Sequence, residues 1–222
     1  MPTAQQSKQT LELLADAAVA DANEILYSLS GTPDAQRYAL LSTVPGLIDY
    51  YSDGSSALAA DFYEDERDRY VSGSFLAEPV VVDRTVKIRR AIAWASDPLF
   101  SADVEQAASR MAEVVQPEVV RPYRDTILAN RRRDPASVGW MRLASPKACG
   151  FCKFLADRGA VYRKDTARFA AHENCMCTAV PVFDGSHVGP EASALQYVAS
   201  KRKRTAAEKE TIRWWVAHYE GR

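Results

Sequence analysis

Cys149-Gly-Phe-Cys152 and His172-Glu-Asn-Cys175-Met-Cys177 contain all 4 cysteines of this 222-residue chain. Thiolate and imidazole groups grouped in this way suit a tetrahedral zinc ion, which takes sulfur and nitrogen ligands. A structural zinc ion closes small folds that bury too little apolar surface to be stable alone. The pattern therefore predicts a zinc-stapled module in the second half of the chain, with one zinc ion per chain.

Five candidate ligands compete for the four positions around that ion. One solution uses Cys149, Cys152 and His172 with one later cysteine, and another uses the four cysteines with His172 hydrogen-bonded to a ligand. The spacing does not choose between them. Cys149 and Cys152 also match a Cys-x-x-Cys redox pair, and cysteines that pack as small apolar residues are a third alternative.

A catalytic zinc ion is less well supported by the motifs. Glu173 stands beside His172 and has the chemistry of a general base. However, the motif orders of zinc deaminases and zinc proteases do not occur, and all of the good ligands can be used by a closed site. The sequence therefore favours a structural zinc ion.

The residues before the module have the spacing of amphipathic helices. Apolar residues recur every three or four positions between Leu11 and Leu29, which predicts a first helix. Gly31 is expected to end this helix, because glycine adopts the left-handed conformation common after a last turn. Thr32-Pro33 is expected to begin the next, with a capping side chain and a first-turn proline.

Further along, prolines suggest where helices stop. Val44-Pro45-Gly46 is expected to break the second helix, and a third is expected from Ser55 to about Tyr70. Val80–Val82 is either a short strand or an extended linker. Residues 86–94 return to helical spacing.

A long helix is expected from Ala102 to about Arg133. Ser101 is its expected capping residue, Pro117 and Pro122 are expected kinks, and Asp134-Pro135 is its expected end.

After residue 135 the segments become short, and glycine, proline and cysteine separate them. Residues 138–143, 159–162 and 178–183 are predicted strands, and the last 30 or so residues are again helical in pattern. The predicted fold class is mainly α. The expected domains are a helical body (1–135), a small α+β zinc module (136–190) and a terminal amphipathic basic helix (191–222).

Charge is distributed unevenly along the chain, although the formal net charge is −1. Residues 1–72 carry 12 Asp and Glu against 4 Lys and Arg, whereas residues 119–171 carry 12 Lys and Arg against 4 Asp and Glu. The two regions are expected to meet different partners, or each other. No run approaches the ~20 apolar residues of a membrane span, so no membrane partner is expected.

The polar start of the chain predicts no secretory signal, and in a reducing cytoplasm paired cysteines favour metal over disulfide. Signals for catalysis or direct nucleic-acid recognition are weak. His187 and His218 are expected to be solvated or capping groups, and no nucleophile elbow or phosphate-binding glycine loop occurs. Arg131–Arg133, Lys201–Arg204 and Trp214-Trp215 have the chemistry to contact phosphates and bases. Helix dipoles and core packing account for them as well.

Four segments together resemble the C-terminal module of phage Mu F-like minor head proteins, which are head-morphogenesis proteins of tailed bacteriophages. The segments are Val138–Leu143, Cys149–Cys152, Gly159–Tyr162 and His172–Cys177. The closing motif of that family is typically His-Pro-x-Cys-Arg-Cys. Here Glu173 replaces its proline and Met176 replaces its arginine, while the thiols and the imidazole are retained. The helical N-terminal part is similar to versions from actinobacterial phages.

The resemblance implies a minor capsid protein rather than an enzyme. Such a virion protein is expected to dock on portal, scaffold or major capsid protein in the host cytoplasm during assembly, and to reside in the phage head or at the portal vertex. Non-specific contact with packaged phage DNA is also implied. A zinc-dependent nuclease or a capsid maturation protease is the alternative from a different class.

Overall fold

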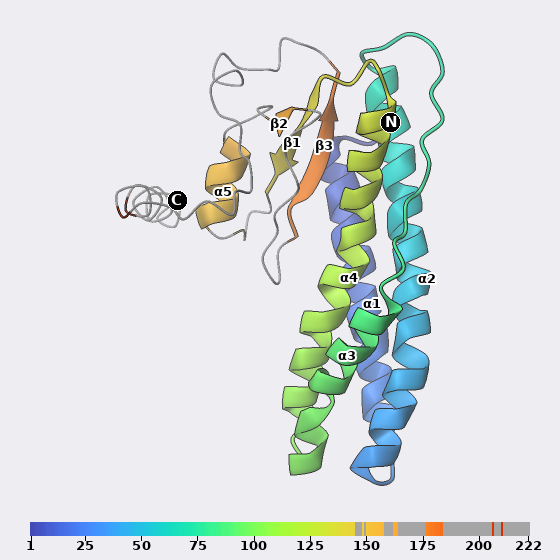
Figure 1. The fold of residues 1–222 in the computed structure, drawn as a ribbon, viewed down its shortest axis with the longest axis vertical. Coiled ribbons are helices and arrows are strands. Elements are labelled where there is room, and N and C mark those ends of the chain that lie inside the picture. Colours follow the sequence, from blue (N-terminus) through green and yellow to red (C-terminus); the bar gives the residue numbers. More distant parts are fainter. Residues whose placement is uncertain are drawn as a thin grey trace. The chain divides into compact units, whose positions relative to one another are not determined.

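The computed structural model describes residues 1–144, 148, 150–157, 162–163, 176–183, 206 and 210. These residues are mainly helical, with one small sheet (Figure 1). The elements are α1 (Ala4–Ser28), α2 (Pro33–Asp68), α3 (Thr85–Ala95), the 3-10 helix η1 (Asp97–Ser101), α4 (Val104–Arg133), β1 (Gly139–Leu143), α5 (Gly150–Asp157), β2 (Tyr162–Arg163) and β3 (Thr178–Val182).

The chain divides into two compact units. The first, called the helical unit here, comprises Gln6–Ala60 and Glu78–Thr126. The second, called the sheet unit, comprises Met1–Gln5, Asp61–Ala77 and Ile127–Arg222. The units group residues by packing rather than by order in the chain, and α2 and α4 each contribute residues to both. The domain boundaries expected at residues 135 and 190 stay predictions.

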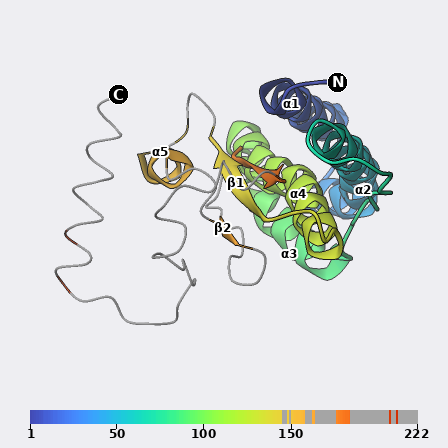
Figure 2. The ribbon, with the colours of Figure 1, turned by 90° about the horizontal axis from the view of Figure 1, so that it is seen from above.

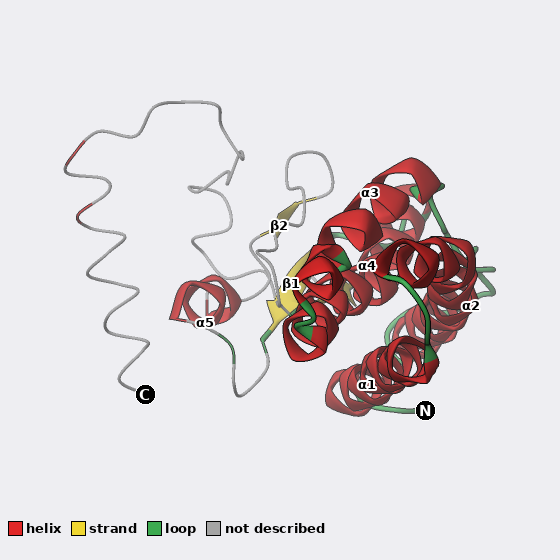
Figure 3. Ribbon diagram, turned by 90° about the horizontal axis from the view of Figure 1, so that it is seen from below, coloured by secondary structure: helices red, strands yellow, loops and turns green. Residues whose placement is uncertain are grey.

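The helical unit is built on the expected amphipathic pattern. Within it, α1, α2 and α4 run side by side and α3 lies beside α4 (Figures 2 and 3). Leu11, Ala15, Ala18 and Ala22 on α1 are completely buried, at the three- and four-residue spacing that places them on one helix face. The hydroxyls of Ser7 and Tyr123 share a buried hydrogen bond of 2.8 Å between α1 and α4.

The turn between α1 and α2 follows the sequence prediction. Gly31 has a φ of +98°, a conformation in which a side chain would be strained. The Thr32 Oγ1 accepts a hydrogen bond of 3.3 Å from the Ala35 N–H, and Pro33 occupies the first helical position. Local chemistry therefore defines this boundary.

The break expected at Val44-Pro45-Gly46 is wrong, because α2 continues from Pro33 to Asp68. Proline has no N–H, so Pro45 leaves the carbonyl of Leu41 without its helical donor. The Arg89 guanidinium, on α3, donates a 2.7 Å hydrogen bond to that carbonyl. A side chain from another helix therefore supplies the missing donor, which no local pattern reveals.

This substitution of donors is testable in a double-mutant cycle. Arg89→Met is expected to lower the free energy of unfolding by about 0.5–1.5 kcal/mol, the worth of a hydrogen bond. In a Pro45→Ala background the loss is expected to shrink, because the residue 45 N–H then serves the Leu41 carbonyl. Chemical denaturation measures both values. Arg90→Met is the matched control, since it removes the same charge from the next position, and equal losses in both backgrounds would contradict the interpretation.

The segment between α2 and α3 is extended, and Val80–Val82 form a linker rather than a strand. The Val80 N–H donates a 2.9 Å hydrogen bond to the Thr126 Oγ1 of α4, which holds this linker in place. α4 begins at Val104, and its cap is Asp103 rather than the expected Ser101, since the Asp103 Oδ1 accepts from the Gln106 N–H at 2.9 Å. Asp103 directly precedes the first helical residue, which is the position from which a side chain can cap the helix, whereas Ser101 lies two residues further away.

α4 then runs to Arg133 without interruption, although it contains Pro117 and Pro122. It ends immediately before Asp134-Pro135, as expected.

The sheet has the strand order β2-β1-β3 with antiparallel neighbours. The predicted strand regions 138–143 and 178–183 contain β1 and β3, and β2 begins at Tyr162, the last residue of the third predicted region. Within the sheet unit, Trp140 on β1 is completely buried, and all residues of β3 are buried. The described part of the chain is thus mainly helical with a small sheet. The expected terminal helix lies outside it, apart from the helical residues 206 and 210.

Among the described residues, no helix combines the length and the apolar composition that crossing a membrane requires.

Candidate metal centre

The sheet and α5 bring Cys152 and Cys177 to one place in the sheet unit. Leu143, the last residue of β1, pairs with Thr178, the first residue of β3. The chain following β1 and the chain preceding β3 therefore emerge at the same end of the sheet. Cys177 directly precedes β3, and α5, which packs on β1, carries Cys152 in its first turn.

Cys152 and Cys177 form one buried cluster, although 24 residues (153–176) lie between them in the sequence. Their exposed fractions are 1% and 0%. Ala144 and Ala148 pack against them and are partly buried. One thiol from each of the two cysteine motifs therefore lies in a buried cluster lined by small apolar side chains.

The other three predicted ligands, Cys149, His172 and Cys175, lie outside the described residues. The described pair fits the donor chemistry of structural zinc, because soft sulfur atoms from two separate segments converge in a buried position. Which four groups complete the ligand set stays a prediction. Cys149 neighbours the start of α5, whereas Cys175 lies two residues before Cys177 in the sequence.

A buried polar network supports the sheet unit at the end of the β1–β3 pair opposite this cluster. Asp134, just after α4, is completely buried. Its Oδ2 accepts hydrogen bonds from the Arg67 Nε at 2.9 Å and from the Tyr63 hydroxyl at 3.3 Å, and its Oδ1 accepts from the Ala136 N–H at 3.0 Å. The charge of Asp134 is thus paired, and both carboxylate oxygens are hydrogen-bonded, as a buried carboxylate requires.

Aromatic contacts extend this network to the sheet. The Tyr63 ring lies edge-on to Phe183, which follows β3, with the ring centroids 5.5 Å apart. It also packs against Phe75, whose ring is approached by the guanidinium groups of Arg67 and Arg133 at 5.5 and 5.6 Å. Burial and the neighbouring Asp134 charge raise the pKa of the Tyr63 phenol. Tyr63 therefore stays a neutral hydrogen-bond donor at physiological pH.

The hydrogen bonds of the Asp134 turn continue into the strands. The Ser137 N–H donates to the Asp134 carbonyl at 3.2 Å, and the Val138 N–H donates to the Val182 carbonyl at 2.9 Å. The position of Asp134 thus sets the start of β1 relative to β3. The network therefore holds the end of the β1–β3 pair that lies opposite the cysteines.

Other residues singled out in the sequence divide into two groups. His187, His218, Lys201–Arg204 and Trp214-Trp215 lie outside the described residues. Within the basic run at the end of α4, Arg131 is completely buried, whereas Arg132 and Arg133 are exposed. A buried guanidinium is not accessible to a phosphate, so the three arginines do not form one exposed basic patch.

Two sets of residues were missed in the sequence. The residues near Asp134 in the sequence do not reveal its partners, because Tyr63 and Arg67 lie far from it in the chain. Their own segment has the pattern of an ordinary charged helix end. The second set is the basic residues around α3. The sequence could have indicated this set, because α3 has three basic residues and no acidic one.

The sequence model of a family described as VG15 protein matches residues 2–201. No curated protein and no solved structure matches the chain.

Proposed function

The chain belongs to the VG15 protein family, a family of viral proteins, and from this premise we propose that it is a minor capsid protein of a tailed phage or prophage. In this proposal it acts in head morphogenesis by docking on portal, scaffold or major capsid protein, and it has no enzymatic turnover. It works in the host cytoplasm during assembly and remains in the virion, inside the head or at the portal vertex. One structural zinc ion holds its C-terminal module together.

The observation that carries the proposal is the burial of Cys152 and Cys177 in one cluster. The Mu F-like resemblance rests on two cysteine motifs, and a common staple requires both to reach the same place. The end of the β1–β3 pair provides that meeting point. The family match over residues 2–201 supports the viral context and includes both motifs.

The distribution of charge supports a docking role for the rest of the chain. The first 72 residues carry a large excess of acidic side chains, and most of them lie on α1 and α2. A strongly acidic surface favours a basic partner surface and speeds the encounter with it. Docking on another head protein uses such complementarity without requiring any catalytic group.

Incorporation into phage heads tests the proposal. Heads assembled with the wild-type chain are expected to contain it at a fixed low copy number, measured by quantitative mass spectrometry of purified heads. Cys152→Ser is expected to reduce the incorporated amount at least about tenfold, because the module loses its staple. Ala148→Ser is the matched control, since it introduces the same hydroxyl into the same cluster and keeps every thiol.

Two results would overturn the proposal. Heads that form normally and never contain the chain would exclude a virion role. Cleavage of DNA or coat protein by the purified chain, with or without added divalent metal, would replace it with the nuclease or protease alternative.

A further inference from the structure

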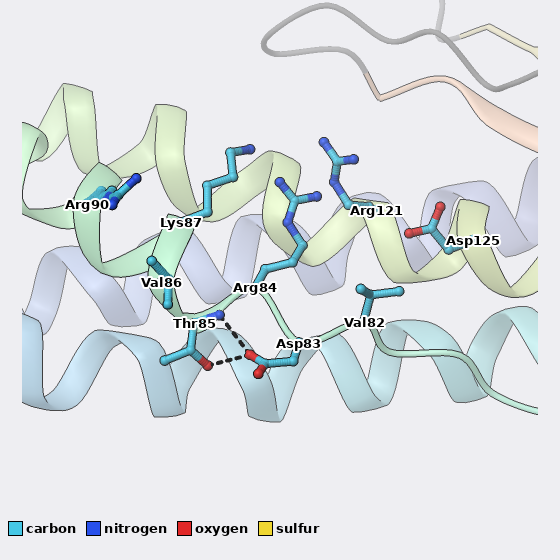
Figure 4. Close-up of a pocket in the computed structure, with 9 residues that line it drawn as sticks. All are labelled: Val82, Asp83, Arg84, Thr85, Val86, Lys87, Arg90, Arg121 and Asp125. Atoms are coloured by element: carbon cyan, nitrogen blue, oxygen red, sulfur yellow. Dashed lines mark hydrogen bonds between the residues drawn. The ribbon is translucent and has the colours of Figure 1, made fainter.

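An open hollow of about 590 Å³ lies on the helical unit, at the N-terminal end of α3. Four basic side chains line it, together with Asp83 and Asp125 (Figure 4). The four are Arg84, Lys87, Arg90 and Arg121. Arg84, Lys87 and Arg90 recur every three residues along the start of α3, and Arg121 faces the hollow from α4. Figure 4 shows Arg84, Lys87 and Arg121 extending to the same side.

Two of the acidic groups around the hollow, Glu118 and Asp83, have other contacts. The Glu118 carboxylate, on α4, pairs with the Arg84 Nε at 3.0 Å and with the Lys87 Nζ at 3.0 Å. The Asp83 Oδ1 accepts hydrogen bonds from the Thr85 N–H at 2.9 Å and the Thr85 hydroxyl at 2.8 Å, and these bonds lower the pKa of Asp83. Asp83 therefore serves the first turn of α3, and Glu118 orders two of the four cations.

Arg90 and Arg121 are the two cations at the hollow that do not pair with Glu118. Across the part of the chain that the structure describes, no carboxylate lies within ion-pairing distance of either guanidinium, and both side chains are exposed. Arg121 also lies near Arg84: burial, and to a smaller extent the Arg121 charge, lower the pKa of the Arg84 guanidinium. Like charges held together in this way favour an anion between them.

The helix direction adds to this imbalance. The N-terminal end of a helix carries partial positive charge, so cations there are unfavourable and anions are favourable. The first turn of α3 contains no acidic residue, its cap Arg84 makes no side-chain capping hydrogen bond, and Asp83, which bonds the Thr85 N–H, precedes the cap. Natural sequences depart from local rules mainly where a function requires it. The arrangement becomes favourable when an anion occupies the hollow.

We propose that this hollow binds phosphate groups of a nucleic acid backbone, without reading the base sequence. A row of cations at regular spacing suits an anion that also repeats, and the exposed guanidinium groups of Arg90 and Arg121 each match a phosphate with two parallel hydrogen bonds. The proposal rests on the assembly role only in identifying the nucleic acid as the packaged genome. The binding itself does not depend on the zinc ion or on incorporation into heads.

Binding of the full chain to a fluorescent 20-base-pair DNA duplex, followed by polarisation at several salt concentrations, tests the proposal. The wild-type chain is expected to bind with an affinity that falls as salt rises, and equally for unrelated sequences. The double variant Arg90→Gln/Arg121→Gln is expected to bind at least about tenfold more weakly at low salt. Its slope of log affinity against log salt is expected to be smaller by about 2, corresponding to two lost phosphate contacts.

The control is Arg89→Gln/Arg110→Gln, which removes the same charge from α3 and α4 outside the hollow and is expected to leave affinity and slope near wild type. Circular dichroism verifies that each variant is folded. Equal losses in both double variants would overturn the proposal, since binding would then follow net charge alone. It would also fail if the wild-type chain bound no duplex, or bound poly-glutamate through Arg90 and Arg121 in preference to DNA. That last result would indicate an acidic protein partner.

Discussion

Cys152→Ser is expected to abolish zinc binding by the purified chain and to unfold the region around α5 and the cysteine end of the sheet. The wild-type chain is expected to hold one zinc ion, measured by elemental mass spectrometry after dialysis. Structural zinc contributes about 10–16 kcal/mol of binding free energy in zinc-finger peptides at neutral pH, so its loss exceeds most other single changes. Serine keeps the size of the side chain but does not supply a soft thiolate.

Chelation and Cys177→Ser are expected to give the same result, because both remove the staple from the same buried cluster. Ala148→Ser should retain zinc and stability within about 1 kcal/mol, the usual range for a modest change at a partly buried site. A metal-free wild-type chain that unfolds at the same denaturant concentration with and without chelator would contradict the zinc prediction. A readily formed Cys149–Cys152 disulfide in that chain would instead favour redox chemistry.

Asp134→Ala is expected to lower the free energy of unfolding by about 3–5 kcal/mol, since it leaves a buried guanidinium without its counter-charge. The side chains of Arg67 and Asp134 are 9% and 0% exposed, so water cannot replace the lost carboxylate. Tyr63 and the Ala136 N–H lose their acceptor at the same time. Chemical denaturation followed by circular dichroism measures the change.

Two comparisons separate this network from a general effect of charge. Asp97→Ala removes a carboxylate that pairs with Arg37 on the surface of the helical unit, where Asp97 is 57% exposed, and is expected to cost at most about 1 kcal/mol. Arg67→Met combined with Asp134→Ala is expected to cost less than the sum of the single changes, since no buried charge is then left alone. Additive losses would show that the ion pair is not the origin of the effect.

Features that neighbouring residues determine were predictable from the sequence. Gly31, Thr32 and Pro33 define the turn between α1 and α2 through a left-handed glycine, a capping hydroxyl and a first-turn proline. The apolar spacing of α1 defined its buried face. The strands near residues 139–143 and 178–182 could likewise be expected from short apolar runs between glycine, proline and cysteine.

Features that depend on a distant partner were not predictable. Pro45 was expected to end a helix, because its neighbours do not reveal that Arg89 supplies a donor to the Leu41 carbonyl. The cap of α4 was misplaced for a smaller reason, since Ser101 and Asp103 both have the chemistry of a cap and only the backbone path selects Asp103.

The sequence by itself determined the donor chemistry of the candidate metal centre, the helical character of the body and the resemblance to phage head proteins. These follow from residue types and short spacings, which express local propensity and ligand preference. Only the tertiary structure decided that Cys152 and Cys177 share a buried cluster, that Asp134 pairs with Arg67, and that Arg90 and Arg121 face the hollow with no carboxylate of the described residues in ion-pairing distance. Burial and electrostatic pairing depend on which distant segments pack together, and that information is spread over the whole chain.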